Sequence, residues 1–389
     1  MTKLEKLIEE LCPNGVEYGT IGDIGNVRMC KRIFKEETSS VGDVPFYKIG
    51  TFGKDADAFI SNEKYNEYKS KYPFPKIGEI LLSAAGTIGR AVVYNGEDAY
   101  YQDSNIVWIN NDESKVLNVF LYYIYTLQPW VASTGGTISR LYNDNLRQAK
   151  IPIPPLPVQR EIVRILDNFT ELTAELTAEL TARKKQYEYY RNKLLTFGDD
   201  VPMKKLGGIC EYSKIRINAD ILNADNYVGV DNLLPDKRGK TFSNYVPNGG
   251  MHTKFVEENI LIGNIRPYLK KIWLSDTTGG TNGDVLVMQV ITNDILPRFL
   301  YQLLSSDVFF AYNMQNAKGA KMPRGNKEAI MNYPIPVPPL AEQERIVAIL
   351  DRFDTLTNDI TAGLPAEIAA RKKQYEYYRN KLLTFTVAS

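Results

Sequence analysis

The sequence ARKKQYEYYRNKLLTF occupies residues 182–197 and recurs unchanged at residues 370–385. An identical run of sixteen residues does not arise by chance, and an internal repeat decides the architecture of a chain. The repeat extends upstream, where IPIPPLPVQREIVRILDNF at 151–169 matches IPVPPLAEQERIVAILDRF at 335–353. Two long copies predict a pseudo-twofold molecule and not a solenoid, which needs three or more short repeats.

The segments that precede these copies resemble each other only in outline. GEILLSAAGTIGRAVVY at 78–94 and ENILIGNIRPYLKKIWL at 258–274 each contain an apolar run, a basic loop and a second apolar run. Each half is therefore a variable segment followed by a near-constant one. We place the segment boundaries at residues 1–150, 151–197, 198–334 and 335–389.

Apolar residues recur at steps of three and four through both near-constant segments, which predicts amphipathic helices. The first copy predicts one helix about 60 Å long, at ~1.5 Å per residue. The second meets Gly363 and Pro365, so we expect a break, with Pro365 in the first turn of a restarted helix. Residues 3–11 predict a further short amphipathic helix.

A long helix with one apolar face needs a partner, and the simplest partner is the other copy, packed antiparallel as a coiled coil. We expect the following residues to form this spacer or to contact partner subunits: Ile162, Ile165, Phe169, Leu172, Leu176, Leu180, Tyr187, Tyr190, Ile346, Leu350, Phe353, Tyr375 and Tyr378.

The first helix also contains a tandem four-residue unit, TAEL, within TELTAELTAELTA at 170–182. Four residues make roughly one turn, so each added unit lengthens a helix by about 6 Å and nearly preserves its face. The unit predicts a spacer of adjustable length. The alternative interpretation is that the TAEL repeat is only a run of good helix formers with no spacer role.

Composition limits the classes of function. The chain has 47 basic and 46 acidic residues, a net charge of +1, so it does not coat nucleic acid through bulk charge. Its three cysteines (Cys12, Cys30 and Cys210) are scattered, which predicts a reducing cytoplasm without disulfides or a zinc site. We expect a cytoplasmic protein with no signal peptide and no membrane span.

No combination of residues in the sequence predicts catalysis. The single histidine, His252, has no nucleophile motif and no second histidine for a metal site. Phosphate-binding and dinucleotide-binding glycine motifs with the required spacing are also missing from the sequence. We therefore expect no catalytic residue, no metal ligand and no cofactor in this chain, and a function in binding.

Loops with basic, aromatic and small polar residues occur in both halves. Arg, Gln, Asn and Ser can pair with base edges, and Lys with phosphates. Each loop taken alone could equally be a solvated turn. Basic residues at matching positions in the two halves, such as Arg140 and Arg324, favour a role in nucleic-acid binding. The candidate DNA-binding residues are Arg28, Lys31, Arg32, Thr87, Arg90, Tyr101, Gln102, Ser133, Thr134, Arg140, Lys214, Arg216, Asn264, Arg266, Tyr268, Lys270, Lys271, Lys318, Lys321 and Arg324.

With these features together, the chain resembles the specificity subunit of type I restriction–modification enzymes over essentially its whole length. The most specific features are the two IP[IV]PPL segments, the two ARKKQYEYYR helices and the tandem TAEL unit. The strand–loop motifs with GTIGR and NIRPYL also resemble those of the recognition domains in this family.

The resemblance implies an α+β fold with two globular, mixed α/β target-recognition domains, separated by a pair of long antiparallel helices. Residues 1–150, with the short N-terminal helix, and 198–334 would be the recognition domains, and 151–197 and 335–389 the conserved spacer helices. Each domain would read one half of a split, asymmetric DNA site. The helices would set the spacing between the half-sites.

The resemblance also implies the partners. They would be double-stranded DNA, two methyltransferase (modification) subunits and two motor-nuclease (restriction) subunits. S-adenosylmethionine, ATP and Mg²⁺ would bind to those subunits and not to this chain. One pseudo-symmetric subunit could organise two identical partners, which could also supply phosphate contacts that its low net charge does not.

Two other classes of function remain. A structural scaffold with paired protein-binding domains would give no sequence-dependent DNA footprint, even with partner subunits present. A stand-alone enzyme would need an unrecognised site. A steep loss of affinity with added salt would favour DNA binding over the scaffold.

Overall fold

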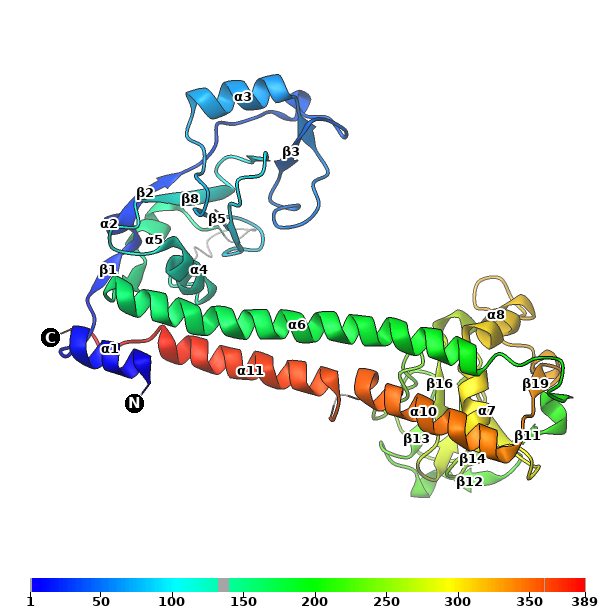
Figure 1. Cartoon of the computed structure of the whole chain (residues 1–389). Coiled ribbons are helices and arrows are strands. Elements are labelled where there is room, and N and C mark those ends of the chain that lie inside the picture. The colour runs from blue at the N-terminus through cyan, green and yellow to red at the C-terminus, as the bar shows by residue number, and fades with distance from the viewer. Residues whose placement is uncertain (1, 132–139, 360, 389) are drawn as a thin grey trace. The chain divides into compact units, whose positions relative to one another are not determined.

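The computed structural model describes residues 2–131, 140–359 and 361–388 (Figure 1). The chain forms two compact units, Met1–Glu175 with Ala369–Ser389 (unit 1) and Leu176–Ile368 (unit 2). Helix α6 (Leu156–Leu194) begins in unit 1 and ends in unit 2, and α11 (Leu364–Leu382) begins in unit 2 and ends in unit 1. Each unit is therefore completed by a helix from the other half of the sequence.

Unit 1 contains a four-stranded antiparallel sheet of order β2-β8-β5-β6. It also has a three-stranded sheet, β4-β3-β7, in which β3 and β7 are parallel, and an antiparallel pair, β1-β9. The strands are β1 (Tyr18–Thr20), β2 (Gly25–Arg28), β3 (Val44–Tyr47), β4 (Phe59–Ile60), β5 (Ile80–Ser83), β6 (Ala91–Val93), β7 (Tyr100–Tyr101), β8 (Ile106–Asn111) and β9 (Lys150–Pro152). The helices are α1 (Lys3–Leu11), α2 (Ile21–Ile24), η1 (Lys35–Glu37), α3 (Asn62–Lys71), α4 (Asn118–Thr126) and α5 (Asn143–Gln148).

Unit 2 repeats this plan with a four-stranded antiparallel sheet β11-β18-β15-β16, a four-stranded sheet β12-β14-β17-β13 with one parallel pair, and an antiparallel pair β10-β19. The strands are β10 (Met203–Lys205), β11 (Cys210–Tyr212), β12 (Arg216–Asn218), β13 (Tyr227–Val228), β14 (Met251–Phe255), β15 (Ile260–Gly263), β16 (Ile272–Leu274), β17 (Gly279–Thr281), β18 (Val285–Val290) and β19 (Pro334–Pro336). The helices are η2 (Leu206–Gly208), η3 (Ala219–Ile221), η4 (Pro267–Leu269), α7 (Pro297–Leu304), α8 (Asp307–Gln315), α9 (Lys327–Met331) and α10 (Leu340–Asn358).

One buried glutamine anchors the helix that follows each variable segment. Oε1 of Gln159 accepts a hydrogen bond from the Leu117 N–H (2.8 Å), and its Nε2 donates to the carbonyls of Lys115 and Pro154 (both 2.7 Å). Gln343 on α10 makes the equivalent three bonds in unit 2. A buried amide with its bonds satisfied fixes register as well as stability, so α6 and α10 are attached to their units in the same way.

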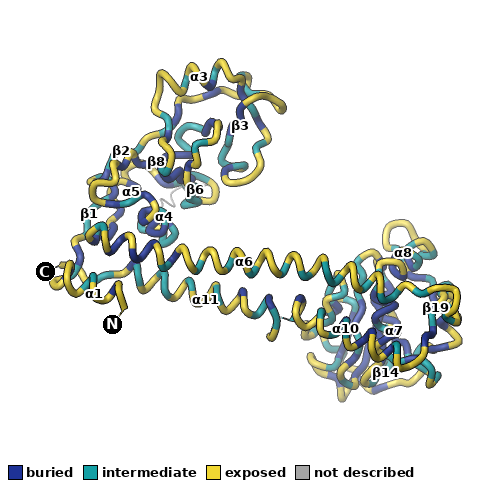
Figure 2. Tube along the Cα trace, in the orientation of Figure 1, coloured by how far each residue is buried: buried dark blue, intermediate teal, exposed yellow. Residues whose placement is uncertain are grey.

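The main core of each unit lies between its antiparallel sheet and its helices. In unit 1, α6 buries Val158, Ile162 and Leu166 in this core (Figure 2). In unit 2, α10 buries Ile346 and Leu350 in the same manner. A second unit 1 core, rich in tyrosine and phenylalanine, lies around β3 and β7. The tyrosine-rich composition thus belongs in large part to packing.

The two repeated helical segments pair with each other within each unit, as the sequence predicts. In unit 1, the ring of Phe169 stacks on that of Tyr378, with centroids 5.5 Å apart. In unit 2, Phe353 stacks on Tyr190 at 5.8 Å and on Tyr187 at 5.9 Å. Phe169 and Phe353 are repeat equivalents, as are Tyr378 and Tyr190, so the same contact forms once in each unit.

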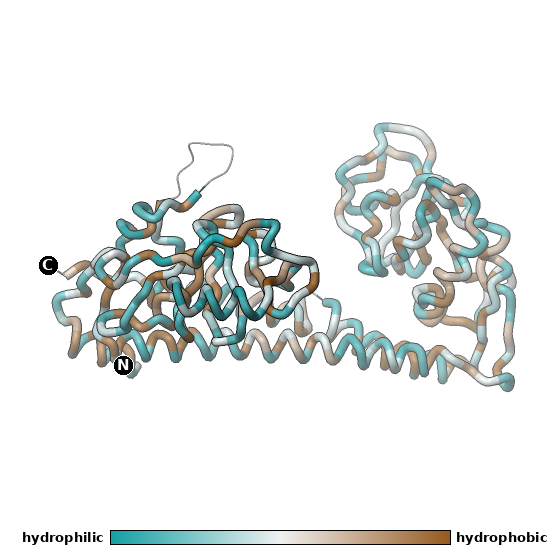
Figure 3. Tube along the Cα trace, turned by 90° about the horizontal axis from the view of Figure 1, so that it is seen from above, coloured by the Kyte–Doolittle hydropathy of each residue, from teal (hydrophilic) through white to brown (hydrophobic). Residues whose placement is uncertain are grey.

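The predicted spacer residues differ in burial along the helices. Hydrophobic and hydrophilic residues alternate along the long helix (Figure 3). Ile165 and Tyr375 are half-buried against the unit 1 core. Leu176 and Leu180 are half-buried, but Leu172 is 36% exposed. The apolar face of each repeated helix is therefore most deeply buried where the helix packs against the core of a unit.

The predicted break in the second copy is confirmed. Helix α10 ends at Asn358, α11 begins at Leu364, and Pro365 is the second residue of α11. Proline is favoured in a first helical turn because its missing N–H would have no partner there.

Candidate nucleic-acid interface

Loops far apart in the unit 1 sequence meet at one end of its antiparallel sheet. The hairpin between β5 and β6 is tied to the loop before β8 by a hydrogen bond from the Ala84 N–H to the Asn105 carbonyl (2.7 Å). A backbone bridge joins Ala85 to Arg140. We call residues 84–90, 102–105 and 140 the unit 1 loop cluster.

The same backbone connections recur in unit 2. The Asn264 N–H donates to the Asp284 carbonyl (2.8 Å), and a bridge joins Ile265 to Arg324. The Arg266 N–H also donates to the Pro323 carbonyl (2.7 Å). We call residues 264–271, 282–284 and 318–324 the unit 2 loop cluster.

The two clusters correspond at both ends of their hairpins, although the unit 2 hairpin is one residue longer. The Ser83 and Gly263 N–H groups bond to the carbonyls of Arg90 and Lys271, and these pairs close the two hairpins. Arg140 and Arg324 bridge equivalent residues, in agreement with the match between them that the sequence indicates. The repeat therefore includes the loops as well as the helices.

Two predicted basic residues of unit 1 hold loop segments together. Nε of Arg32 is 2.8 Å from a carboxylate oxygen of Asp103, and the guanidinium of Arg140 donates to the Ser104 carbonyl (3.2 Å). Both side chains also remain partly solvent-accessible, and Arg32 is 58% exposed. Their positive charge is available at the surface in a fixed place.

Three other predicted residues of unit 1 have their side chains turned inward. Nη1 of Arg90 donates to the Phe52 carbonyl (2.5 Å), and Oε1 of Gln102 accepts from the Ile49 N–H (3.0 Å). Tyr101 is buried and stacks on a neighbouring tyrosine ring. The structure thus places Tyr101 in the aromatic core and not on the loop surface, because its position in strand β7 points the ring into that core.

The remaining predicted unit 1 residues lie at the surface or outside the described residues. Arg28 is exposed at the end of β2, next to the end of the sheet that carries the loop cluster. Lys31 and Thr87 are also exposed. Ser133 and Thr134 lie outside the described residues.

Aspartates bind two of the predicted basic residues in unit 2. Nη1 of Arg324 is 2.9 Å from Oδ1 of Asp284. Nζ of Lys270 is 3.0 Å from Oδ1 of Asp307, which also binds Nζ of Lys237 at 2.9 Å. The two hydrogen-bonded ammonium groups lower the pKa of Asp307 to about 2, so this carboxylate is ionised at neutral pH.

Two further predicted residues of unit 2 have internal roles. Nζ of Lys271 donates to the Val230 carbonyl (2.6 Å), and burial lowers the pKa of this lysine. Asn264 is buried beneath the hairpin, so its side chain is not on the loop surface. Its backbone is part of the loop connections described above.

Several predicted residues of the unit 2 loop cluster present basic or aromatic groups to solvent. They are Arg266, Tyr268, Lys318, Lys321 and Arg324. Lys214 is exposed after β11, 3.9 Å from Glu211. Arg216 is exposed on β12, in the second sheet of the unit, and donates to Thr253 (3.1 Å). No described contact joins Arg216 to the loop cluster.

Asp284 and Asp307, the acidic residues that bind Arg324, Lys270 and Lys237 in unit 2, were not indicated by any pattern in the sequence. Asp284 is 40 positions from Arg324, and Asp307 is 37 positions from Lys270 and 70 from Lys237. Residues this far apart in sequence come together only in the folded unit, so these ion pairs could not be predicted from the sequence.

The reactive side chains of the described residues have structural surroundings. All three cysteines are free and buried, and burial raises the pKa of Cys30 and Cys210 to about 12. His252 lies 3.3 Å from the Gly249 carbonyl. Among the described residues there is no cluster of His, Cys, Asp and Glu able to hold a metal ion, and no helix is long and apolar enough to cross a membrane.

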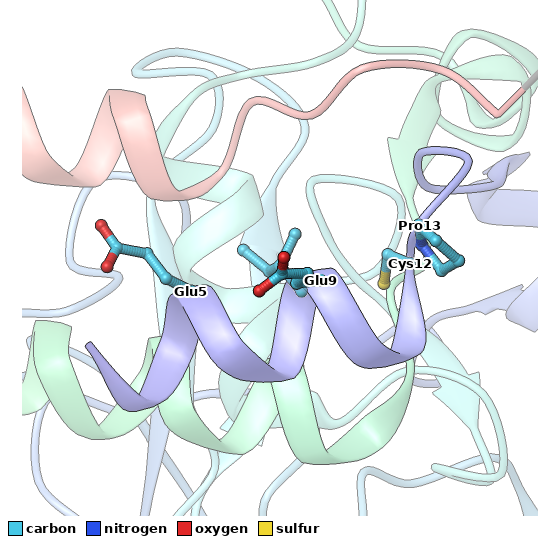
Figure 4. A pocket seen from close by; sticks show the side chains of 5 residues that line it. Glu5, Glu9, Cys12 and Pro13 are labelled. Atoms are coloured by element: carbon cyan, nitrogen blue, oxygen red, sulfur yellow. The ribbon is translucent and has the colours of Figure 1, made fainter. Parts of the chain in front are cut away.

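A shallow, open hollow lies beside α1 (Figure 4). It has a volume of about 670 Å³ and is lined by Glu5, Ile8, Glu9, Cys12 and Pro13. Its two charged side chains are acidic, which does not suit a phosphate or a nucleic acid.

Known proteins with this sequence pattern identify the family. A model of the type I restriction modification DNA specificity domain matches the chain twice, over residues 13–183 and 199–370. The chain belongs to this family of DNA specificity subunits. It is the specificity subunit of a type I restriction–modification system, with two recognition domains.

Individual relatives agree with the family match. The chain is 31% identical to the specificity subunit of the type I restriction enzyme EcoR124I/EcoR124II of Escherichia coli, over 99% of this chain and 97% of the relative. It is 59% identical to a putative type I specificity subunit of Haemophilus influenzae, over 46% of this chain and 47% of the relative. The crystal structure of a type I S subunit from M. genitalium shares the fold, with a TM-score of 0.55 and 16% identity, over 95% of this chain and 96% of that one.

Proposed function

We propose that this specificity subunit reads a split, asymmetric DNA site, with one half-site bound by each loop cluster. The observation that carries the proposal is that both units use the same loop framework with different exposed side chains. The tip of the unit 1 hairpin presents Thr87, and that of the unit 2 hairpin presents Arg266 and Tyr268. Different side chains on an equivalent framework favour two different half-sites.

The basic side chains of the clusters suit DNA in two ways. Arg266 is exposed and can pair with a guanine edge, and Lys318 and Lys321 can neutralise phosphates. Arg32 and Arg324 are held by single carboxylates and keep 58% and 55% of their side chains exposed. The net charge of +1 is compatible with this role because the positive groups are gathered locally.

The repeated helices support the binding of two identical partner subunits. Most residues of the identical segment that are exposed in one copy are exposed in the other; Tyr189 and Tyr377, for example, are 62% and 61% exposed. Packing within the chain does not require such residues to be the same. We propose that they bind two methyltransferase subunits, and that two motor-nuclease subunits complete the complex. The exposed pairs are Lys184 and Lys372, Lys185 and Lys373, Glu188 and Glu376, Tyr189 and Tyr377, Asn192 and Asn380, and Lys193 and Lys381.

The catalytic groups and cofactors belong to those partners in this proposal. The chain itself would contribute recognition without catalysis, and S-adenosylmethionine, ATP and Mg²⁺ would bind to the methyltransferase and motor-nuclease subunits. The buried, protonated thiols of Cys30 and Cys210 suit a reducing cytoplasm, where we propose that the complex works.

Mapping of methylated adenines tests the proposal. The chain is co-expressed with its cognate modification subunit, and methylated positions are located across the host genome by single-molecule sequencing. We expect one bipartite motif, with two different half-sites and a fixed gap without sequence preference. An assembled and active complex that gives no such motif would instead support a scaffold that binds only proteins.

A further inference from the structure

The hairpin between β15 and β16 of unit 2 has positive φ angles at residues other than glycine. Arg266 and Lys270 flank helix η4 with left-handed backbone angles, φ +52° and +50°. The adjacent turn contains two more such residues, Asp236 and Lys237, with φ +56° and +62°. Side chains with a Cβ rarely adopt this conformation, which persists only where the surroundings enforce it.

The matching hairpin of unit 1 has glycine where its backbone has positive φ. Gly86 lies three residues after Ser83, as Arg266 does after Gly263, and Gly89 directly precedes Arg90, as Lys270 precedes Lys271; their φ values are +65° and +84°. Glycine adopts positive φ without steric cost, so this hairpin needs no external support for its shape. The unit 2 hairpin is one residue longer and has no glycine at either position.

Asp307 provides the support that the unit 2 hairpin lacks. This residue is the first of α8, which packs against η4. Its Oδ1 binds Nζ of Lys270 at 3.0 Å and Nζ of Lys237 at 2.9 Å. One carboxylate therefore joins the hairpin to the adjacent turn, with both ammonium groups more than half-shielded from solvent.

Backbone hydrogen bonds connect the same two strained segments. The Asp236 N–H donates to the Leu269 carbonyl (2.9 Å), and the Lys237 N–H donates to the Lys270 carbonyl (3.0 Å). Three of the four residues with positive φ, Asp236, Lys237 and Lys270, take part in these two bonds. Release of the two ammonium groups would therefore allow both segments to relax together.

We call the ion pairs of Asp307 with Lys270 and Lys237 the clamp. The basic residues of the hairpin differ in whether they make internal contacts or face solvent. Lys270 is bound to Asp307 and Lys271 to the Val230 carbonyl. Arg266 is exposed and Tyr268 is 50% exposed. The two lysines shape the hairpin, and the arginine and tyrosine at its tip face solvent.

We propose that Asp307 is a positioning residue for DNA recognition by unit 2: by binding Lys270 and Lys237, it holds the hairpin in the left-handed shape that presents Arg266 and Tyr268. The contribution to recognition rests on the function proposed above, whereas the clamp itself concerns only this chain. In unit 1, glycine replaces the clamp.

Hydrogen exchange in the full chain, complexed with its modification subunits and without DNA, tests the clamp. Asp307 is 68% exposed, so Asp307→Asn should fold normally. We expect exchange in residues 235–239 and 264–271 to become about tenfold faster, with residues 84–90 unchanged as the internal control. Asp307→Glu keeps the charge and should restore most of the protection. Unchanged exchange in Asp307→Asn would overturn the clamp.

A glycine variant separates the shape of the hairpin from general stability. Lys270→Gly gives unit 2 the glycine that unit 1 has at this position. In this background, Asp307→Asn should change exchange and DNA affinity by less than about twofold, against roughly three- to tenfold for the affinity in the wild-type background. An equal loss in both backgrounds would make Asp307 a merely stabilising residue and overturn the proposal.

The methylation motif reports on recognition independently of exchange. We expect Asp307→Asn to relax one half-site and to leave the other half-site and the gap unchanged. Faster exchange with an unaltered motif and affinity would show that the hairpin is clamped but not used in recognition, which would overturn the positioning role. A wild-type complex without any motif would refute the proposed function, and the clamp would still be judged by exchange.

Discussion

Basic side chains near the two loop clusters fall into two groups according to their partners. Arg90, Lys270 and Lys271 bind carbonyl or carboxylate oxygens within their own unit. Arg266 and Lys318 are exposed on the loop surface. A charged side chain in an internal bond cannot turn to DNA without breaking that bond, so the second group is the better source of base contacts.

One buried ion pair at the start of α6 belongs to unit 1 only. Oε2 of Glu161 is 2.8 Å from Nζ of Lys3 on α1, and Oε1 is 2.7 Å from the guanidinium of Arg164. The glutamate side chain is 3% exposed. These hydrogen-bonded cations lower its pKa from 4.5 to about 2. The ionised form therefore attaches α1 to α6.

This lowered pKa predicts an acid sensitivity of unit 1. Because the folded pKa is the lower one, the stabilisation is fully present above about pH 5 and is lost as the pH falls towards 2. Glu161→Gln should lower the Tm at pH 7 by roughly 2–6 °C. It should also reduce the fall in Tm between pH 5 and pH 3, measured by scanning calorimetry.

Glu342→Gln is the matched control for this prediction. Glu342 makes the same kind of pair with Arg345 on α10 (2.6 Å), but its side chain is 38% exposed and no lysine joins it. The Tm of this variant should stay within about 1 °C of the wild type. Equal effects of the two substitutions would refute a special role for the Glu161 pair.

At the scale of elements, the sequence predicted helices far better than sheets. The period of apolar residues predicted α1 and α6, and Gly363 and Pro365 predicted the break before α11, because each of these features depends on residues that are close in sequence. The pairing of strands could not be predicted in this way, since each residue of β3 pairs with a residue of β7 that lies 54 positions later in the chain (Phe46 with Tyr100, Tyr47 with Tyr101). The same limit hid the ion pairs of Asp284 and Asp307, whereas the basic loops themselves were visible as residue types.

The TAEL unit yields a prediction about α6. Residues 170–182 are helical throughout and lie between the Phe169 and Tyr187 contacts, which belong to different units. One added TAEL unit would extend the helix by about 6 Å between these two contacts and rotate its face by only about 40°. We expect the methylation motif to keep both half-sites and to gain a longer gap. An unchanged gap in an active complex would exclude a spacer role for these residues.

At the scale of the molecule, the internal repeat is present in the strand order, the buried glutamines, the aromatic stacks and the loop connections. The sequence indicated two halves, but it did not show that the end of each repeated helix packs in the core of the other half. Leu194 and Phe197 pack in unit 2, and their repeat equivalents Leu382 and Phe385 pack in unit 1. The sequence could not show which unit each copy packs in, because the two segments are identical and either one would fit either core.

The central claim is that each loop cluster reads its own half of the DNA site. The most direct test compares the methylation motifs of two variants at matching hairpins, Arg266→Ala in unit 2 and Thr87→Ala in unit 1, with that of the wild-type complex. We predict that each variant relaxes a different half of the motif and that the gap stays the same. Relaxation of the same half by both variants, or an unaltered motif in both, would contradict the claim.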